Sequence, residues 1–372
     1  MSKLIMPLHK SIYRMSALLG AGILFAFATF ISCEEELASR QGSQYFTEAQ
    51  TDSALAYCHA QVLRTMAQED AAAMLQDDED FNIYHPRNIE VTDTVWSMRS
   101  VYAVEWCSGF WPGILWYDYA FTGDQAVATA AVASTMAMQL VLDEPTIGHD
   151  LGVMLYSSAG TGLHVLEQEL QRTDLTVQER SADSLTAEFF NTLLVRAADS
   201  LATLQSPSVN AISSWPNSTA MFWGYFSHNK ALQEQTESSN MADSIYGFTM
   251  CARETGSEEF LIQAQQAAEN YLQHFSETIP DVTAATVAAS ALIELSTLSE
   301  KKDLSQLYID AAAQILSRLS SDRYQSHQRN AAFLLHSPGD NTNQPEANAS
   351  EIRADYYYIE ALTRYKALFN KQ

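Results

Sequence analysis

The residues with the most chemical content lie in the segment 105–117, which reads Glu-Trp-Cys-Ser-Gly-Phe-Trp-Pro-Gly-Ile-Leu-Trp-Tyr. Indole and phenol rings offer flat faces on which the C–H faces of a sugar can stack. Gly109 and Gly113 have no Cβ, so another chain of atoms can approach their backbone closely. We expect Trp106 and Trp111 to bind a ligand. The alternative is an aromatic core cluster at the start of a helix.

A second candidate is the pair His149-Asp150, which precedes a helix-like apolar run from Leu151. The simplest role of an aspartate at this position is to cap the helix through its side chain. A carboxyl group can also act as a general acid or base, and a neighbouring histidine can bind a polar substrate. The residues alone leave these roles open.

These segments are two of five that follow one another in the order seen in a known family. The segments are 106–116, 149–156 (His-Asp-Leu-Gly-Val-Met-Leu-Tyr), 246–250 (Tyr-Gly-Phe-Thr-Met), 281–295 and 334–362, within about residues 82–366. Together they resemble glycoside hydrolase family 88, the unsaturated glucuronyl hydrolases. Five ordered matches are far more specific than any single motif.

The resemblance implies an all-α fold, an (α/α)6 barrel of repeated helical hairpins, with the active site in its mouth. It implies a substrate with a Δ4,5-unsaturated uronic acid at the non-reducing end, left by a polysaccharide lyase. Water is added across the C4=C5 enol ether, and the resulting hemiketal collapses to release the sugar. The resemblance makes Asp150 catalytic and places Trp106, His149 and Trp111 against the substrate, with no cofactor and no metal.

Several positions depart from the family pattern. The family's second catalytic aspartate falls on Ser213, which cannot donate a proton as a carboxylic acid does. Its Arg-Gly-Gln-Ala-Trp segment falls on 239–243, which removes an arginine suited to a uronate carboxylate. Glu237 and Asp243 are candidates for a replacement acid. A family member that binds carbohydrate without turnover is therefore the main alternative.

A different resemblance gives a third alternative. The residues Gly162-Leu163-His164-Val165-Leu166-Glu167 fit the Gly-x-His-x-x-Glu motif of imelysin-like proteins, in which it is tied to metal binding. His164 and Glu167 share a helix face at this spacing. Three fixed positions arise easily by chance, so this interpretation has the least support.

Helical periodicity dominates the rest of the chain. It predicts helices over 125–142, 187–204, 260–275, 284–295 and 307–319, whereas β-branched alternation favours one strand, over 89–96. Polar turns near 122, 173, 255 and 301 precede Ala- and Leu-rich helices. Gaps of roughly one helical hairpin between most of these turns indicate a repeated α/α array. The interval between the second and third turns does not fit the period.

The first residues are typical of an export signal. Lys3, Lys10 and Arg14 precede an apolar stretch that ends at Ser32-Cys33, and three glutamates follow directly. This resembles a bacterial lipoprotein signal, and the acidic triplet resembles the surface-export signal of Bacteroidetes lipoproteins; a transmembrane anchor is the alternative. We therefore expect a signal peptide over 1–32 and a lipidated Cys33. A tether and first-helix start over 33–60 would lead into a hydrolase-like domain over 61–372, on the outer membrane or cell surface.

The net charge of the chain limits the classes of molecule that it can bind. The 372 residues include 45 acidic and 21 basic side chains, and the 340 residues after the signal peptide carry a formal net charge of −27. Such a body lacks the basic clusters that nucleic acid requires, so we expect an oligosaccharide as the partner and membrane contact only through the lipid. A uronide site would need local positive charge against this background. The three cysteines after Cys33 are far apart and predict buried free thiols.

Overall fold

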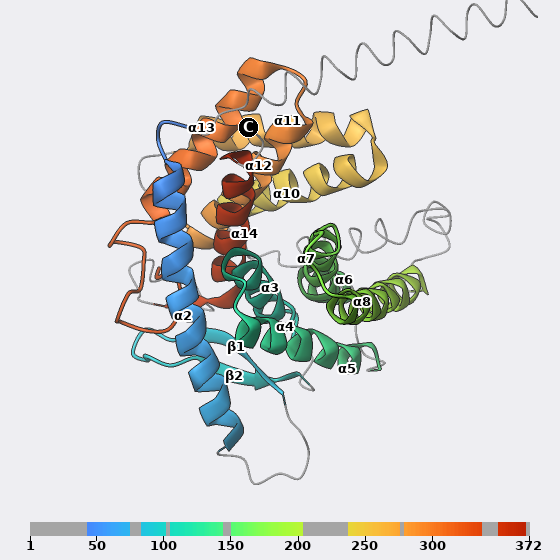
Figure 1. The fold of residues 1–372 in the computed structure, drawn as a ribbon. Coiled ribbons are helices and arrows are strands. Elements are labelled where there is room, and N and C mark those ends of the chain that lie inside the picture. Colours follow the sequence, from blue (N-terminus) through green and yellow to red (C-terminus); the bar gives the residue numbers. More distant parts are fainter. Residues whose placement is uncertain are drawn as a thin grey trace, which may run out of the picture.

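The computed structural model describes residues 43–74, 83–101, 105–143, 150–203, 237–275, 279–336 and 349–369. Within these residues the protein is almost entirely helical, as the periodicity predicts (Figure 1). The helices form an inner layer and an outer layer, and the difference follows from how many of their faces are apolar.

Two helices of the inner layer are buried on all sides over most of their length. In α12 every residue from 282 to 296 is buried, and in α14 every residue from 352 to 362 is buried. Figure 1 shows α14 in the middle of the molecule, between α2 and α10. The inner elements are α3 (Phe110–Thr122), α6 (Asp150–Leu155), the π-helical turn η2 (Tyr156–Gly160), α7 (Thr161–Glu169), α10 (Glu237–Thr255), α12 (Val282–Leu298) and α14 (Ile352–Phe369).

Outer helices bury one face only. In α11 the buried side chains are Ala264, Ala268 and Tyr271, which recur at the spacing of one helical face. The outer elements are α2 (Glu48–Met74), α4 (Gln125–Ala137), α5 (Gln139–Leu142), α8 (Val177–Thr203), α11 (Glu258–His274) and α13 (Lys302–Leu319). These bounds confirm the five predicted helices, with α4 and α5 sharing the segment 125–142.

The four predicted turns each connect an inner helix to the outer helix that follows it. They join α3 to α4, α7 to α8, α10 to α11 and α12 to α13. Asp124 begins α4 by accepting a hydrogen bond from the Ala126 N–H at 2.8 Å, as an N-cap should. The hairpin repeat is thus confirmed for these four units. The irregular interval includes residues 204–236, which lie outside the described residues.

Side-chain contacts show that α3 and α14 run in the same direction. Near their first turns the rings of Phe110 and Tyr356 lie 5.1 Å apart, and further along Tyr117 donates to Glu360 at 2.9 Å. The segment α6–η2 runs parallel to α3 as well. A Cβ on Gly109 would overlap the Met154 carbonyl, and one on Gly113 the Ser157 carbonyl. The close approach predicted for these glycines is therefore to the protein's own backbone.

The helices α10 and α12 share this direction. Asp243 of α10 pairs with Arg353, and three residues later Tyr246 stacks edge-on against Tyr357 with ring centroids 5.1 Å apart. Ser290 of α12 donates to Glu360, and four residues later Glu294 pairs with Arg364 of α14. The inner helices that the structure describes therefore have their N-terminal ends at one end of the layer.

A small antiparallel sheet lies beside this N-terminal end. Its strands are β1 (Tyr84–Ile89), β2 (Ser97–Ser100) and β3 (Ser350–Glu351), in the order β2-β1-β3. The predicted strand over 89–96 is wrong, because only Ile89 lies in β1 and residues 90–96 form the connection between β1 and β2. Asp93 N–H bonds the Glu90 carbonyl in a turn, and the side chains of Val91 and Val95 are exposed rather than packed on a sheet face.

Two further sequence features can be placed. Gln125–Leu142, which contains α4 and α5, is the one helical stretch in the described residues with the length and hydropathy to cross a membrane. It packs on α3, which is also how an outer helix of a folded domain is covered. Cys58, Cys107 and Cys251 are buried free thiols, as predicted.

One carboxylate joins four inner helices. Glu360 of α14 is 1% exposed, and its oxygens accept hydrogen bonds from Tyr117 of α3 at 2.9 Å, Tyr246 of α10 at 2.9 Å and Ser290 of α12 at 2.7 Å. Arg364, one turn later on α14, balances the charge at 3.1 Å. A buried charge that is both paired and hydrogen-bonded avoids most of the desolvation penalty.

The variant Glu360→Gln should therefore destabilise the fold by about 3 kcal/mol or more, because it leaves Arg364 with less compensation in a buried site. Glu48→Gln is the matched control, since Glu48 also pairs with a cation of α14, Lys366, but at the surface. It should cost less than about 1 kcal/mol. Urea denaturation measures both values, and equal losses would contradict the central role of Glu360.

Candidate active site

Four residues with reactive or ligand-binding side chains lie at the N-terminal end of the inner helices. Trp106 lies four residues before the start of α3, Asp150 is the first residue of α6, Asp243 is the seventh of α10 and Arg353 is the second of α14. We call this end the mouth. Helix dipoles direct their positive ends toward it, which favours an anionic ligand.

Trp106 is held by the turn that leads into α3. Its ring is half-buried and lies edge-on to Phe110, with centroids 5.8 Å apart and an interplanar angle of 85°. Backbone bonds from Ser108 N–H to Glu105 and from Phe110 N–H to Cys107 form the turn. Trp106 thus remains partly accessible at the mouth, as a stacking residue must be.

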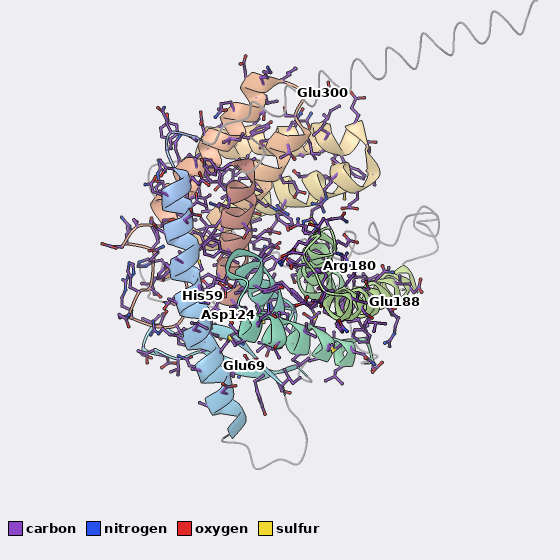
Figure 2. The ribbon with its side chains drawn as sticks, viewed as in Figure 1. His59, Glu69, Asp124, Arg180, Glu188 and Glu300 are labelled. Carbon is purple, nitrogen blue, oxygen red and sulfur yellow. The ribbon has the colours of Figure 1, made fainter. Side chains whose placement is uncertain are left out.

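Trp111 lies in the core, against the outer helix α2, rather than at the mouth. Its side chain is 1% exposed, and its indole N–H donates to Glu69 of the outer helix α2 at 3.0 Å. Figure 2 shows Glu69 on α2. Burial raises the pKa of Glu69 to about 7. The two tryptophans predicted to bind ligand are therefore not brought together, and the contacts of Trp111 are those of a packing residue.

The His149-Asp150 pair is described in part. Asp150 is half-buried at the start of α6, one turn before Met154, whose carbonyl touches Gly109 of α3. This contact fixes the height of Asp150 relative to α3 and places it at the same end as Trp106. His149 lies outside the described residues, as do Ser213 and the rest of the segment that aligns with the second catalytic aspartate of the family.

A buried ion pair lies at the mouth between α10 and α14. Arg353 Nη2 donates to Asp243 Oδ1 at 2.6 Å, and the two side chains are 8% and 5% exposed. The Arg353 guanidinium also lies 5.8 Å from the centre of the Tyr357 ring. Asp243, a candidate for the replacement acid, is thus a hydrogen-bond acceptor for arginine. The side chain of Glu237, the other candidate, is outside the description.

Two more arginines lie at the rim of the mouth. Glu105, next to Trp106, accepts from Arg87 of β1 at 2.8 Å and pairs with Arg99 of β2 at 3.3 Å. The two guanidinium groups form a small cluster of cations beside the tryptophan. The net charge of the chain gives no indication of it.

Sequence reasoning missed Arg353, Arg87 and Arg99. A weak signal exists for Arg353, because it interrupts the apolar run at the start of α14, where a buried cation is rare unless paired. For the other two, the hairpin between β1 and β2 would have to be predicted first. Ser239, on which the family's arginine position falls, lies one turn before Asp243 on α10.

The imelysin-like motif lies toward the other end of the inner helices. The Gln168 amide lies 2.9 Å from His164 Nε2, and burial together with the charges of Arg253 and Arg364 lowers the pKa of His164. Within the described ranges no three His, Cys, Asp or Glu side chains are grouped as metal ligands.

The chain is similar to known proteins in both sequence and structure. No family model matches the chain. It is 24% identical over 367 residues to an unsaturated glucuronyl hydrolase of Formosa agariphila, covering 77% of this chain and 86% of the relative. It is also 24% identical over 333 residues to an unsaturated glucuronyl hydrolase of Bacillus sp. strain GL1, covering 70% of this chain and 86% of the relative.

Solved structures give the same likeness. A heparin-specific unsaturated glucuronyl hydrolase superposes with a TM-score of 0.61 at 23% identity, over 84% of this chain and 98% of that one. The Bacillus sp. GL1 enzyme superposes with a TM-score of 0.59 at 19% identity, over 86% of this chain and 96% of that one. The enzyme of Streptococcus agalactiae gives 0.61 at 14% identity, over 87% and 93%. The fold is an (α/α)6 barrel.

His85 of β1 contacts the turn that carries Trp106, and its burial predicts how the stability of the protein depends on pH. Its Nδ1 donates to the Ser108 carbonyl at 2.8 Å within the turn that carries Trp106. Burial lowers the pKa of His85 from 6.5 to about 4. Because the unfolded chain gains a proton first as pH falls, the stability contribution of neutral His85 is complete above pH 6.5 and is lost toward pH 4.

We therefore expect His85→Gln to lose less stability than the wild type on acidification. Between pH 7 and pH 5 the wild type should lose about 2 kcal/mol more free energy of unfolding than the variant. Urea denaturation at the two pH values measures this difference, with the exposed His274→Gln as the control. Parallel losses in wild type and His85→Gln would contradict the burial of a neutral imidazole.

Proposed function

We propose that this protein is a glycoside hydrolase that acts on Δ4,5-unsaturated uronic acids at the non-reducing end of lyase-generated oligosaccharides. The observation that supports this most is the joint presence of Trp106, Asp150 and Arg353 at the mouth of an (α/α)6 barrel. Solved structures of unsaturated glucuronyl hydrolases with this fold include complexes with dGlcA-Glc-Rha-Glc and with dGlcA-GalNAc6S. A sugar that stacks on an indole and carries a carboxylate fits these three side chains.

The reaction is hydration of an enol ether. A proton adds to C4 and the hydroxyl of water adds to C5, so the C4=C5 bond is consumed. The product is a hemiketal at C5, which collapses with cleavage of the glycosidic bond and releases the next sugar. The protein must deliver one proton to carbon and remove one proton from water.

We assign both proton transfers to Asp150. As a carboxylic acid it protonates C4, and as the resulting carboxylate it takes a proton from the attacking water. The proton balance then closes on one residue, which is needed because Asp243 accepts a hydrogen bond from Arg353 and the family's second aspartate is replaced by Ser213. His149, directly before Asp150, remains a predicted substrate contact.

Trp106 supplies the stacking surface in this proposal. Its partly exposed ring is fixed edge-on against Phe110, so little side-chain freedom is lost when a sugar binds. We do not assign Trp111 to the substrate, because its contacts are with α2. The reaction as written uses neither a metal nor a cofactor.

The variant Asp150→Asn should reduce turnover at least about a hundredfold, because an amide cannot transfer the proton. The measurement is the loss of ultraviolet absorbance of the conjugated uronate when the protein is incubated with unsaturated disaccharides. Asp124→Asn is the matched control, since Asp124 also begins a helix but lies on the outer layer (Figure 2). Unchanged turnover in Asp150→Asn would contradict the assignment.

A second candidate function is carbohydrate binding without turnover. It is favoured by the replacement of the second catalytic aspartate by Ser213. Calorimetry with the same disaccharides separates the two candidates. Binding by wild-type protein without any loss of absorbance would favour this second function, whereas turnover excludes it.

We also propose that the protein is a lipoprotein of the outer membrane or cell surface, attached through Cys33. The support is sequence alone: a basic start, an apolar stretch and Ser32 before Cys33. In the folded domain α2 begins at Glu48, so roughly fifteen residues separate the lipid from the first described helix. This tether would let the mouth meet soluble oligosaccharides near the membrane.

Cys33→Ala in the full-length chain should move the protein from the membrane fraction to the soluble or secreted fraction of a Gram-negative host. The reason is that one thioether-linked anchor would carry the whole membrane affinity. Cys58→Ala, at a buried thiol of the folded domain, is the control and should remain with the membrane. An unchanged distribution of Cys33→Ala would favour a transmembrane anchor instead.

A further inference from the structure

We propose that Arg353, positioned by Asp243, is the residue that recognises the uronate carboxylate of the substrate. This inference rests on the proposed function and deepens it. It concerns a pair formed across two inner helices, with Arg353 Nη2 and Asp243 Oδ1 2.6 Å apart at the mouth.

The position of Arg353 is unfavourable for stability alone. It is the second residue of α14, where the positive end of the helix dipole repels a cation. Its side chain is also 8% exposed, so the charge has lost most of its hydration. A buried ion pair of this kind gains little over apolar residues of similar size. Exceptions to local stability rules of this kind concentrate at functional sites.

The surroundings of the guanidinium hold it in one orientation. Asp243 binds one edge, and the face of the Tyr357 ring lies 5.8 Å from the guanidinium carbon. Tyr357 is itself fixed by an edge-on contact with Tyr246 of α10. A cation held before the ligand arrives loses little conformational entropy on binding.

The chemistry of the ligand follows from the fork geometry of arginine. A guanidinium has five N–H donors in one plane, enough to bind an aspartate and a second carboxylate at the same time. Planar carboxylates are the groups that arginine binds in a bidentate way. The C5 carboxylate of an unsaturated uronide is such a group, and it adjoins the double bond that Asp150 is proposed to protonate.

Charge gives an independent reason. The chain carries a formal net charge of −24, so an anionic sugar is repelled at long range. At the mouth, Arg353 acts together with Arg87 and Arg99, which both pair with Glu105 at the rim. Recognition of the anion therefore depends on a few local cations, of which Arg353 is the one on an inner helix.

The test compares an unsaturated uronic acid disaccharide with its uronate methyl ester, which keeps the double bond and removes the negative charge. Wild-type protein should have a kcat/KM at least tenfold higher for the acid. Arg353→Gln should lower kcat/KM for the acid by about 10- to 100-fold, as expected for a lost charge-assisted hydrogen bond, and leave the ester nearly unchanged. A higher KM of Arg353→Gln for the acid, rather than a lower kcat, should account for most of this loss.

The matched control is Arg196→Gln, which breaks an exposed arginine–aspartate pair with Asp143 between two outer elements. It should keep the preference for the acid. Asp243→Asn should raise KM for the acid while keeping part of the preference, because Arg353 remains but is less firmly held. A merely structural pair would change both substrates equally in either variant.

The outcomes are distinguishable. If wild-type protein turns over the acid but shows no preference over the ester, the inference is overturned while the proposed function stands, and this needs no variant to fold. An unchanged preference in folded Arg353→Gln overturns it as well. If the wild type binds without turnover, affinities from calorimetry replace kcat/KM in the same comparison. If it neither binds nor turns over the acid, both proposals fall.

Discussion

The arrangement of this protein depends on one buried carboxylate. Glu360 accepts hydrogen bonds from Tyr117, Tyr246 and Ser290, and thereby sets the heights of α3, α10 and α12 relative to α14. A hydrogen bond has a narrow range of lengths, so these helices cannot slide past one another without leaving a buried charge unsatisfied. The mouth lies about two turns away along the same helices. The relative positions of Trp106, Asp243 and Arg353 depend on this contact, and the packing of α6 on α3 then places Asp150.

Much of the fold could be predicted because its signals are local. Polar turns before Ala- and Leu-rich helices marked four hairpins, and the resemblance to family 88 supplied the barrel that links them. The prediction of a strand over 89–96 was wrong because Val91 and Val95, although β-branched, are exposed to solvent in the connection between β1 and β2. Propensity describes what a residue tolerates, whereas pairing with β3, more than 250 residues later, decides where β1 lies.

The candidate site could be predicted only in part, for a related reason. Trp106 lies shortly before α3 and Asp150 begins α6, so sequence position alone brings them to the same end of the inner layer. Trp111 is five residues after Trp106, but the helical turn directs it toward Glu69 of α2. Arg353 could not be assigned from its neighbours, because the partner that makes its burial possible, Asp243, comes from a helix 110 residues earlier.

The sheet order β2-β1-β3 joins the beginning of the domain to its end. β1 follows α2, β3 directly precedes α14, and Tyr365 of α14 binds the backbone of Ser43 and Phe46. The rim of the mouth and Arg353 are therefore assembled from segments near the two ends of the described part of the chain, which leave the ribosome at very different times. Contacts this distant in sequence form slowly and late. The mouth can therefore be completed only once α14 has been synthesised, long after β1.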